Sequence, residues 1–241
     1  MMYPLFWDPT FLLLIPALIF ALWAQWKVKS TYSKYAQVAN RRGLTGAETA
    51  QLILRDADVA MAGQRWGRGD GVALEPVGGT LTDHYDPRSR TLRLSQDIYY
   101  GRSVAALGIA AHEVGHAIQH ANGYAPLLAR NFVYPVSRFG STLAFPIFIV
   151  GMFLGPGTGQ IVMQIAIMMF AAAVGFTVIT LPVEFNASRR AMKALANGGY
   201  LTQDELRGAR KVLRAAAMTY VAAAGMAALQ LVRMILLSNR R

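Results

Sequence analysis

Residues 103–121 have the sequence SVAALGIAAHEVGHAIQHA, which predicts a single helix. Ser103 is typical of the N-cap position, and Gly123 follows where a helix of this length is expected to end. Most of the side chains between them are small or apolar, so the helix is expected to be buried. The polar residues that remain on it therefore require a chemical explanation.

His112 and His116 are four residues apart on this predicted helix. Residues at that spacing lie one turn apart on the same face, so both imidazoles can bind one Zn²⁺. Glu113 projects beside them, where it can take a proton from a water molecule that the metal has made more acidic. Gly115 costs the helix about 1 kcal/mol relative to alanine, which indicates close approach by another backbone or by a third metal ligand.

A hydrolytic zinc site needs a third protein ligand and one open position. Glu184 is a candidate because it directly follows a long apolar run, although an interfacial salt bridge would also explain it. His84 is the fallback ligand, but its polar cluster, residues 83–86, is expected to be structural or to line the substrate. His120 is two turns from His112, about 12 Å along the helix axis, which is too far for a shared metal.

Further residues are candidates for orienting a ligand or contacting the substrate. Ser188 follows Glu184 by four residues and can hydrogen-bond a ligating histidine, and Ala187 is small enough to allow close packing there. An extended substrate peptide is expected to pair with the edge of the short strands near 81–94. The candidates for stabilising the oxyanion of a peptide substrate are His84, Tyr85, Arg189, Arg190 and Tyr220.

The composition indicates a membrane protein. The 241 residues are 54% hydrophobic and only 15% charged, which is too apolar for an ordinary soluble domain. The net charge of +11 comes from basic residues that cluster beside hydrophobic runs, which favours anchoring at a membrane over nucleic-acid binding. Because the chain has no cysteine, any metal must be held by His, Asp or Glu.

Apolar runs of roughly the length needed to cross a bilayer occupy residues 9–26, 139–154, 161–183 and 215–237. The first run has basic residues only after it, which predicts an uncleaved anchor with its N-terminus outside and the next domain in the cytoplasm. The segment 155–159, GPGTG, predicts the turn of a helical hairpin that begins at 139 or as early as 132. The fourth run contains Arg233, so it is either a span or a helix packed within the protein.

The predicted fold is mostly α and integral to the membrane, with three to four transmembrane helices and a cytoplasmic α+β zincin-like module. Within that module, 44–59 predicts an amphipathic helix that starts with the Thr45–Glu48 capping pattern. Residues 72–95 predict a small antiparallel sheet of two or three strands. Five domains are expected: an anchor (1–26), the catalytic module (27–131), a transmembrane hairpin (132–183), a cytoplasmic helical segment with the third ligand (184–214) and a C-terminal hydrophobic helix (215–241).

Four segments together resemble the bacterial YugP-type neutral zinc metallopeptidases: LTDHYDPRSRTLRLS (81–95), AAHEVGHAIQH (110–120), LPVEFNASRRAM (181–192) and VLRAAAMTYVAAA (212–224). More distantly, HEVGH followed by E-x-x-A-S resembles the HtpX-type membrane metalloproteases, whose helix with the third ligand has E-x-x-A-D. The resemblance implies His112, His116 and Glu184 as zinc ligands and Glu113 as the base. Ser188 stands where the HtpX-type pattern has Asp.

The expected function is a zinc-dependent endopeptidase with one Zn²⁺ per chain, in a multi-pass protein of the cell (inner) membrane. Its substrates are expected to be membrane or membrane-adjacent proteins, cleaved at the cytoplasmic interface, and nucleic acid is not an expected partner. The alternative is a zinc-bearing membrane scaffold or chaperone that cleaves nothing, and the presence of Glu113 speaks against it. Oligomeric state does not follow from the sequence.

Overall fold

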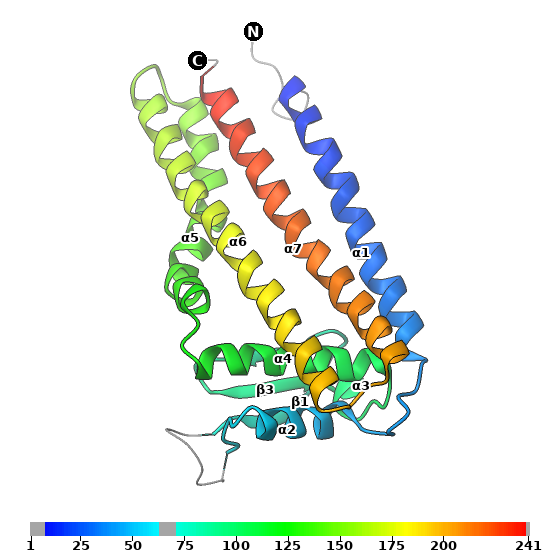
Figure 1. The fold of residues 1–241 in the computed structure, drawn as a ribbon. Coiled ribbons are helices and arrows are strands. Elements are labelled where there is room, and N and C mark those ends of the chain that lie inside the picture. Colours follow the sequence, from blue (N-terminus) through cyan, green and yellow to red (C-terminus); the bar gives the residue numbers. More distant parts are fainter. Residues whose placement is uncertain (1–7, 63–70, 240–241) are drawn as a thin grey trace. The chain divides into compact units, whose positions relative to one another are not determined.

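The computed structural model describes residues 8–62 and 71–239 (Figure 1). The first residues of the predicted anchor, 1–7, and the chain end, 240–241, lie outside the described residues. The chain forms two compact units. The first, here called the helical unit, comprises Met1–Gln25, Leu128–Pro182 and Met218–Arg241, and the second, the mixed unit, comprises Trp26–Leu127 and Val183–Ala217.

The helical unit consists of parts of four long helices, preceded by a short 3-10 helix, η1 (Pro9–Leu14). The long helices are α1 (Ile15–Ala36), α5 (Ala125–Phe153), α6 (Thr158–Asn197) and α7 (Gln203–Ser238). In the described part of the chain, all four contain an apolar stretch long enough to cross a membrane, with η1 extending the first of them. The fourth apolar run, which the sequence left open, thus lies in a helix with the length and composition of a span.

The predicted hairpin is present as α5 and α6, joined by a short turn in which Gly157 has a φ of +89°. Phe148, Met163 and Met234 are almost completely buried between these helices and α7. The first helix of the hairpin begins at Ala125, earlier than predicted. Gly123, with a φ of +60°, ends the preceding helix, and the chain resumes helical geometry almost at once.

Two helices of the mixed unit begin where side chains cap their free backbone N–H groups. At α2 (Gly46–Asp56), Thr45 Oγ1 accepts from the backbone of Glu48 at 3.1 Å, and Glu48 Oε2 accepts from the backbone of Thr45 at 2.8 Å. At α4 (Val104–Ala121), Ser103 Oγ accepts from Ala106 N at 3.1 Å. Both predicted helix starts are confirmed.

The sheet contains β1 (Ala73–Val77), β2 (His84–Asp86) and β3 (Thr91–Ser95) in the order β1-β3-β2. β2 is antiparallel to β3, but β1 is parallel to it, so the prediction of a purely antiparallel sheet is wrong. A tight turn at 78–79 would have paired β1 with β2. Residues 78–83 instead connect β1 to the other side of β3, which leaves β2 on the sheet edge.

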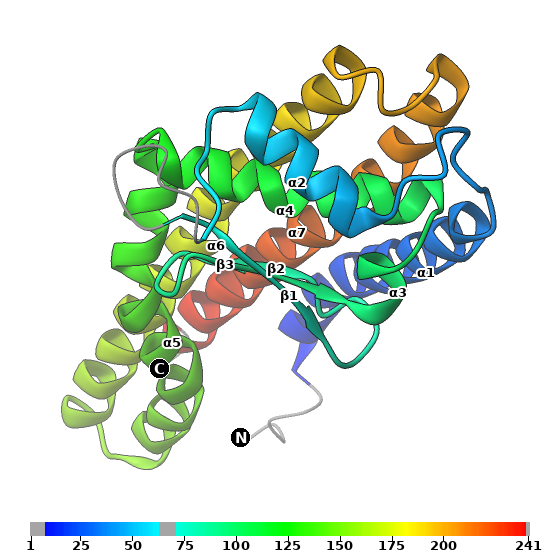
Figure 2. The ribbon, with the colours of Figure 1, turned by 90° about the horizontal axis from the view of Figure 1, so that it is seen from below.

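Helix α4 is the centre of the mixed unit. It packs against α2, as Figure 2 shows, and it also contacts β2, β3 and the short helix α3 (Gln96–Tyr99). Its small side chains share one core with Leu92 and Leu94 of β3 and with Leu195 and Leu213 of α6 and α7, all of which are buried. The polar residues of α4 therefore belong to a helix that neighbouring helices and strands hold in place.

Candidate metal centre

Gly115 brings α4 and α6 into backbone contact. A Cβ atom at position 115 would lie 2.6 Å from the carbonyl oxygen of Ala187, which is itself fully buried. The close approach predicted from Gly115 and Ala187 is thus confirmed. Glu184 precedes Ala187 by three residues on α6, so this contact carries its carboxylate to the histidines of α4.

His112, His116 and Glu184 meet at one point. Glu184 Oε2 lies 3.2 Å from His112 Nε2 and 3.5 Å from His116 Nε2. One potential ligand atom from each residue lies within 4.8 Å of the other two. Among residues 8–62 and 71–239, these three form the one group of His, Asp and Glu side chains that could hold a metal ion. His116 and Glu184 are buried, while His112 keeps some exposure.

The separations between Glu184 and the two histidines fit a zinc ion. Donor atoms bonded to a tetrahedral zinc at about 2.0–2.2 Å lie about 3.4 Å apart, and the two His–Glu distances of 3.2 and 3.5 Å bracket that separation. Two imidazoles and one carboxylate also form a donor set typical of catalytic zinc, because they leave a fourth position open.

Each histidine is oriented by a protein group on its other ring nitrogen. Ser188 Oγ lies 3.1 Å from His112 Nδ1, as the sequence suggested, and Gln119 Oε1 lies 3.0 Å from His116 Nδ1. Burial is the largest single influence on His116 and acts to lower its pKa. The hydrogen bonds to Glu184 and Gln119 and the charges of Glu113 and Glu184 together outweigh burial and raise that pKa above its usual value. In both rings, Nε2 is the nitrogen that faces Glu184.

Sequence reasoning missed Gln119. This residue is completely buried, and its Nε2 donates to the carbonyl of Val183 at 2.8 Å and to Asn186 Oδ1 at 3.0 Å. The sequence did contain a signal for this role, because Gln119 is a polar residue three positions after His116 on an otherwise apolar helix.

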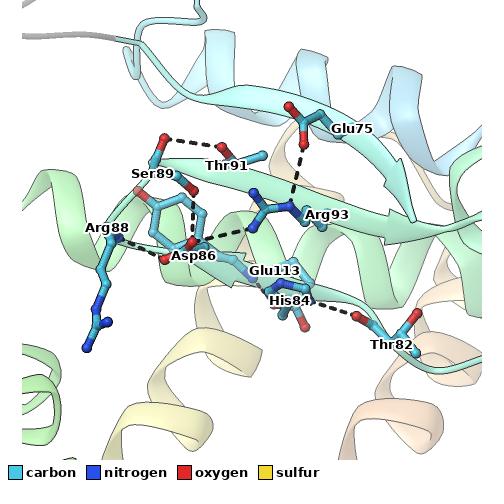
Figure 3. A network of polar contacts seen from close by, with 10 residues as sticks. Glu75, Thr82, His84, Asp86, Arg88, Ser89, Thr91, Arg93 and Glu113 are labelled. Atoms are coloured by element: carbon cyan, nitrogen blue, oxygen red, sulfur yellow. Dashed lines mark hydrogen bonds and ion pairs between the residues drawn. The ribbon is translucent and has the colours of Figure 1, made fainter. Parts of the chain in front are cut away.

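Glu113 is held by the sheet edge. Its buried carboxylate accepts a hydrogen bond from the backbone N–H of Tyr85 at 3.0 Å. Figure 3 shows Glu113 beside β2. The candidate base therefore lies next to the edge strand, one residue along α4 from a candidate metal ligand. Its negative charge also acts to raise the pKa of His116.

Tyr85 also connects β2 to the end of α4. Its hydroxyl lies 2.8 Å from His120 Nδ1, and burial raises the pKa of Tyr85 to about 12. The phenol therefore stays protonated at neutral pH and shares a hydrogen bond with His120. His120 lies outside the group of three potential metal ligands and in the last turn of α4, near the helix end as expected.

The remaining polar residues of 83–86 have structural contacts, and Figure 3 shows those of His84 and Asp86. Asp83 accepts from the backbone N and the hydroxyl of Ser95, and burial raises the pKa of Asp83. Asp86 stabilises the turn before β3, where its carboxylate accepts from Arg88 N at 2.9 Å. His84 is exposed and donates from Nδ1 to the carbonyl of Thr82 at 2.8 Å.

Two other candidates lie on the long helices. Arg189 is exposed on α6. Tyr220 is on the part of α7 that belongs to the helical unit, and its role in the site stays a prediction.

Comparison with known proteins agrees with this centre. Residues 10–239 match the model of the family described as "Putative neutral zinc metallopeptidase", and the chain belongs to that family. It is 47% identical over 225 residues to the Bacillus subtilis (strain 168) protein named "Putative membrane protease YugP", a match that covers 93% of this chain and 94% of the relative. The family resemblance seen in the sequence is confirmed. No solved structure matches.

Proposed function

We propose that this protein is a membrane-embedded zinc-dependent endopeptidase that cleaves membrane or membrane-adjacent proteins at the cytoplasmic interface. His112, His116 and Glu184 hold one Zn²⁺ per chain in this proposal, and Glu113 is the general base. The observation that carries it is that three donor atoms, two from α4 and one from α6, lie within 4.8 Å of one another, and that α4 also bears Glu113.

The chemistry divides between the metal and the chain. When bound, zinc supplies a Lewis acid that polarises a carbonyl group and makes water more acidic. Glu113 accepts a proton from the water that attacks the peptide carbonyl and then returns it to the leaving nitrogen. Both transfers need a carboxylate held in one place, and the hydrogen bond from Tyr85 N to Glu113 Oε2 restrains it.

The sheet edge supports the proposal that the substrate is an extended polypeptide. β2 pairs with β3 on one side, and Tyr85 directs its backbone N–H toward Glu113. A peptide that joins this edge through backbone hydrogen bonds would pass along the side chain of the base. Binding through the backbone would give weak sequence selectivity.

The position of Glu184 in the chain supports membrane substrates. It directly follows the apolar run 161–183 within the single helix α6. A ligand at the end of a spanning segment keeps the zinc close to the membrane surface. Arg189, Arg190 and Lys193 come next, which favours the cytoplasmic side.

The variant Glu113→Gln tests the proposal in the purified full-length protein. Glutamine keeps an acceptor for Tyr85 N–H but cannot take the proton, so zinc content by elemental analysis should stay near one per chain while cleavage of casein or a membrane protein falls at least about 100-fold. Glu75→Gln, at an exposed carboxylate on β1, is the matched control. Near wild-type cleavage by Glu113→Gln would exclude Glu113 as the base.

A further inference from the structure

Gln119 is completely buried, and both polar atoms of its side chain have hydrogen-bond partners. Its oxygen faces His116 Nδ1 at 3.0 Å, and its nitrogen donates to the Val183 carbonyl at 2.8 Å and to Asn186 Oδ1 at 3.0 Å. Asn186 Oδ1 also accepts from Arg190 Nε at 2.8 Å. One continuous series of hydrogen bonds therefore runs from Arg190 to a candidate zinc ligand.

The chemistry of Arg190 sets the direction of this series. A guanidinium can only donate, so the Asn186 atom that faces it must be the oxygen. That oxygen can only accept, so the Gln119 atom that faces it must be the NH₂ group, as the Val183 carbonyl also requires. The remaining atom of the Gln119 amide is its oxygen, and it faces His116.

An oxygen acceptor next to His116 Nδ1 requires a proton on that nitrogen. Nε2 of the neutral ring then keeps its lone pair, and Nε2 is the atom that lies 3.5 Å from Glu184 Oε2. His112 differs, because its partner is the Ser188 hydroxyl, which can either donate or accept. The protein thus specifies the tautomer of His116 through the orientation of the Gln119 amide, which both the Val183 carbonyl and the Arg190–Asn186 pair require.

We propose that Gln119, Asn186 and Arg190 are positioning residues that keep His116 in the tautomer able to bind zinc through Nε2. This inference rests on the proposed function, because it assigns His116 as a ligand. Arg190 then acts at a distance on the zinc site and need not contact substrate.

The test compares zinc retention and thermal stability in full-length, zinc-loaded variants challenged with a chelator. Gln119→Met removes the acceptor and should weaken zinc binding about 10–100-fold. Gln119→Glu keeps an acceptor for His116 but loses the donors to Val183 and Asn186, so it should be less stable than Gln119→Met yet hold zinc more tightly. A purely structural role predicts the opposite order, in which zinc retention follows stability.

Asn186 and Arg190 give a second comparison that leaves Gln119 intact. Asn186→Asp keeps an oxygen for both donors and should retain zinc like the wild type, whereas Asn186→Leu should weaken binding by up to about tenfold. Arg190→Met should act in the same direction as Asn186→Leu. Lys193→Met removes the same charge from an exposed position on α6 and is the control.

The outcomes separate this inference from the proposed function. If wild-type protein holds no zinc, the proposed function fails. A second outcome is that the wild type holds zinc and cleaves protein while Gln119→Met and Asn186→Leu retain zinc as well as the wild type does. In that case the positioning role is wrong and the proposed function stands.

Discussion

Gly115 lies so close to Ala187 that a methyl group on it would stand 2.6 Å from the Ala187 carbonyl oxygen. This contact between α4 and α6 sets the distance between the histidines and Glu184. Gly115→Ala should force the helices apart, and the overpacking cost of about 1–3 kcal/mol should exceed the gain in helix propensity of about 1 kcal/mol. We expect lower thermal stability, much weaker zinc binding and loss of proteolysis.

Gly175→Ala is the control for this prediction. Gly175 also lies within a helix, α6, but a Cβ atom there would meet nothing within 4 Å. Its zinc content and activity should match those of the wild type. Full zinc occupancy and activity in Gly115→Ala would contradict the view that this contact controls the site.

Glu184→Ala should lose most bound zinc and all activity, because two histidines alone leave a weak site. His120→Ala should keep its zinc, since His120 is bonded to Tyr85 and lies outside the ligand group. His84→Ala serves as the second comparison, and elemental analysis of the three purified variants decides between them. Retention of zinc by Glu184→Ala together with its loss from His84→Ala would reverse the ligand assignment.

Removal of the metal should destabilise the protein. A ligand at 100 times its dissociation constant stabilises the folded state by about 2.7 kcal/mol, and a chelator abolishes that contribution. The wild type should therefore unfold at a lower temperature in the presence of a chelator, and added zinc should restore the original value. Glu184→Ala should show little response to either addition, and an equal response in both proteins would place the stabilising zinc elsewhere.

The predicted topology can be tested by labelling, because the chain contains no cysteine of its own. A cysteine placed at Arg42 should be protected from a membrane-impermeant thiol reagent in intact cells, whereas one placed at Thr158 should react. Both positions are exposed in the structure, so burial within the protein does not account for a difference. The reverse pattern would place the proposed zinc site outside the cytoplasm.

Features of the fold that depend on neighbouring residues could be predicted from the sequence. The Thr45–Glu48 capping box and the start of α4 at Ser103 are settled within a single helical turn. The apolar runs follow from composition over about 20 residues. The direction of β1 could not be predicted, because it depends on where the 78–83 connection places β2.

The sequence by itself determined the family, the apolar helices and the pairing of His112 with His116, since a spacing of four residues on a helix puts two side chains on one face. From the residue types alone, it limited the candidates for a third metal ligand to Glu184 and, as the fallback, His84. Only the tertiary structure brought Glu184 to both histidines, because that meeting depends on the contact of Gly115 with Ala187, 72 residues along the chain. The series of hydrogen bonds from Arg190 through Asn186 to Gln119 is likewise visible only in the tertiary structure. A hydrogen bond between distant segments of the chain forms only once those segments have packed together.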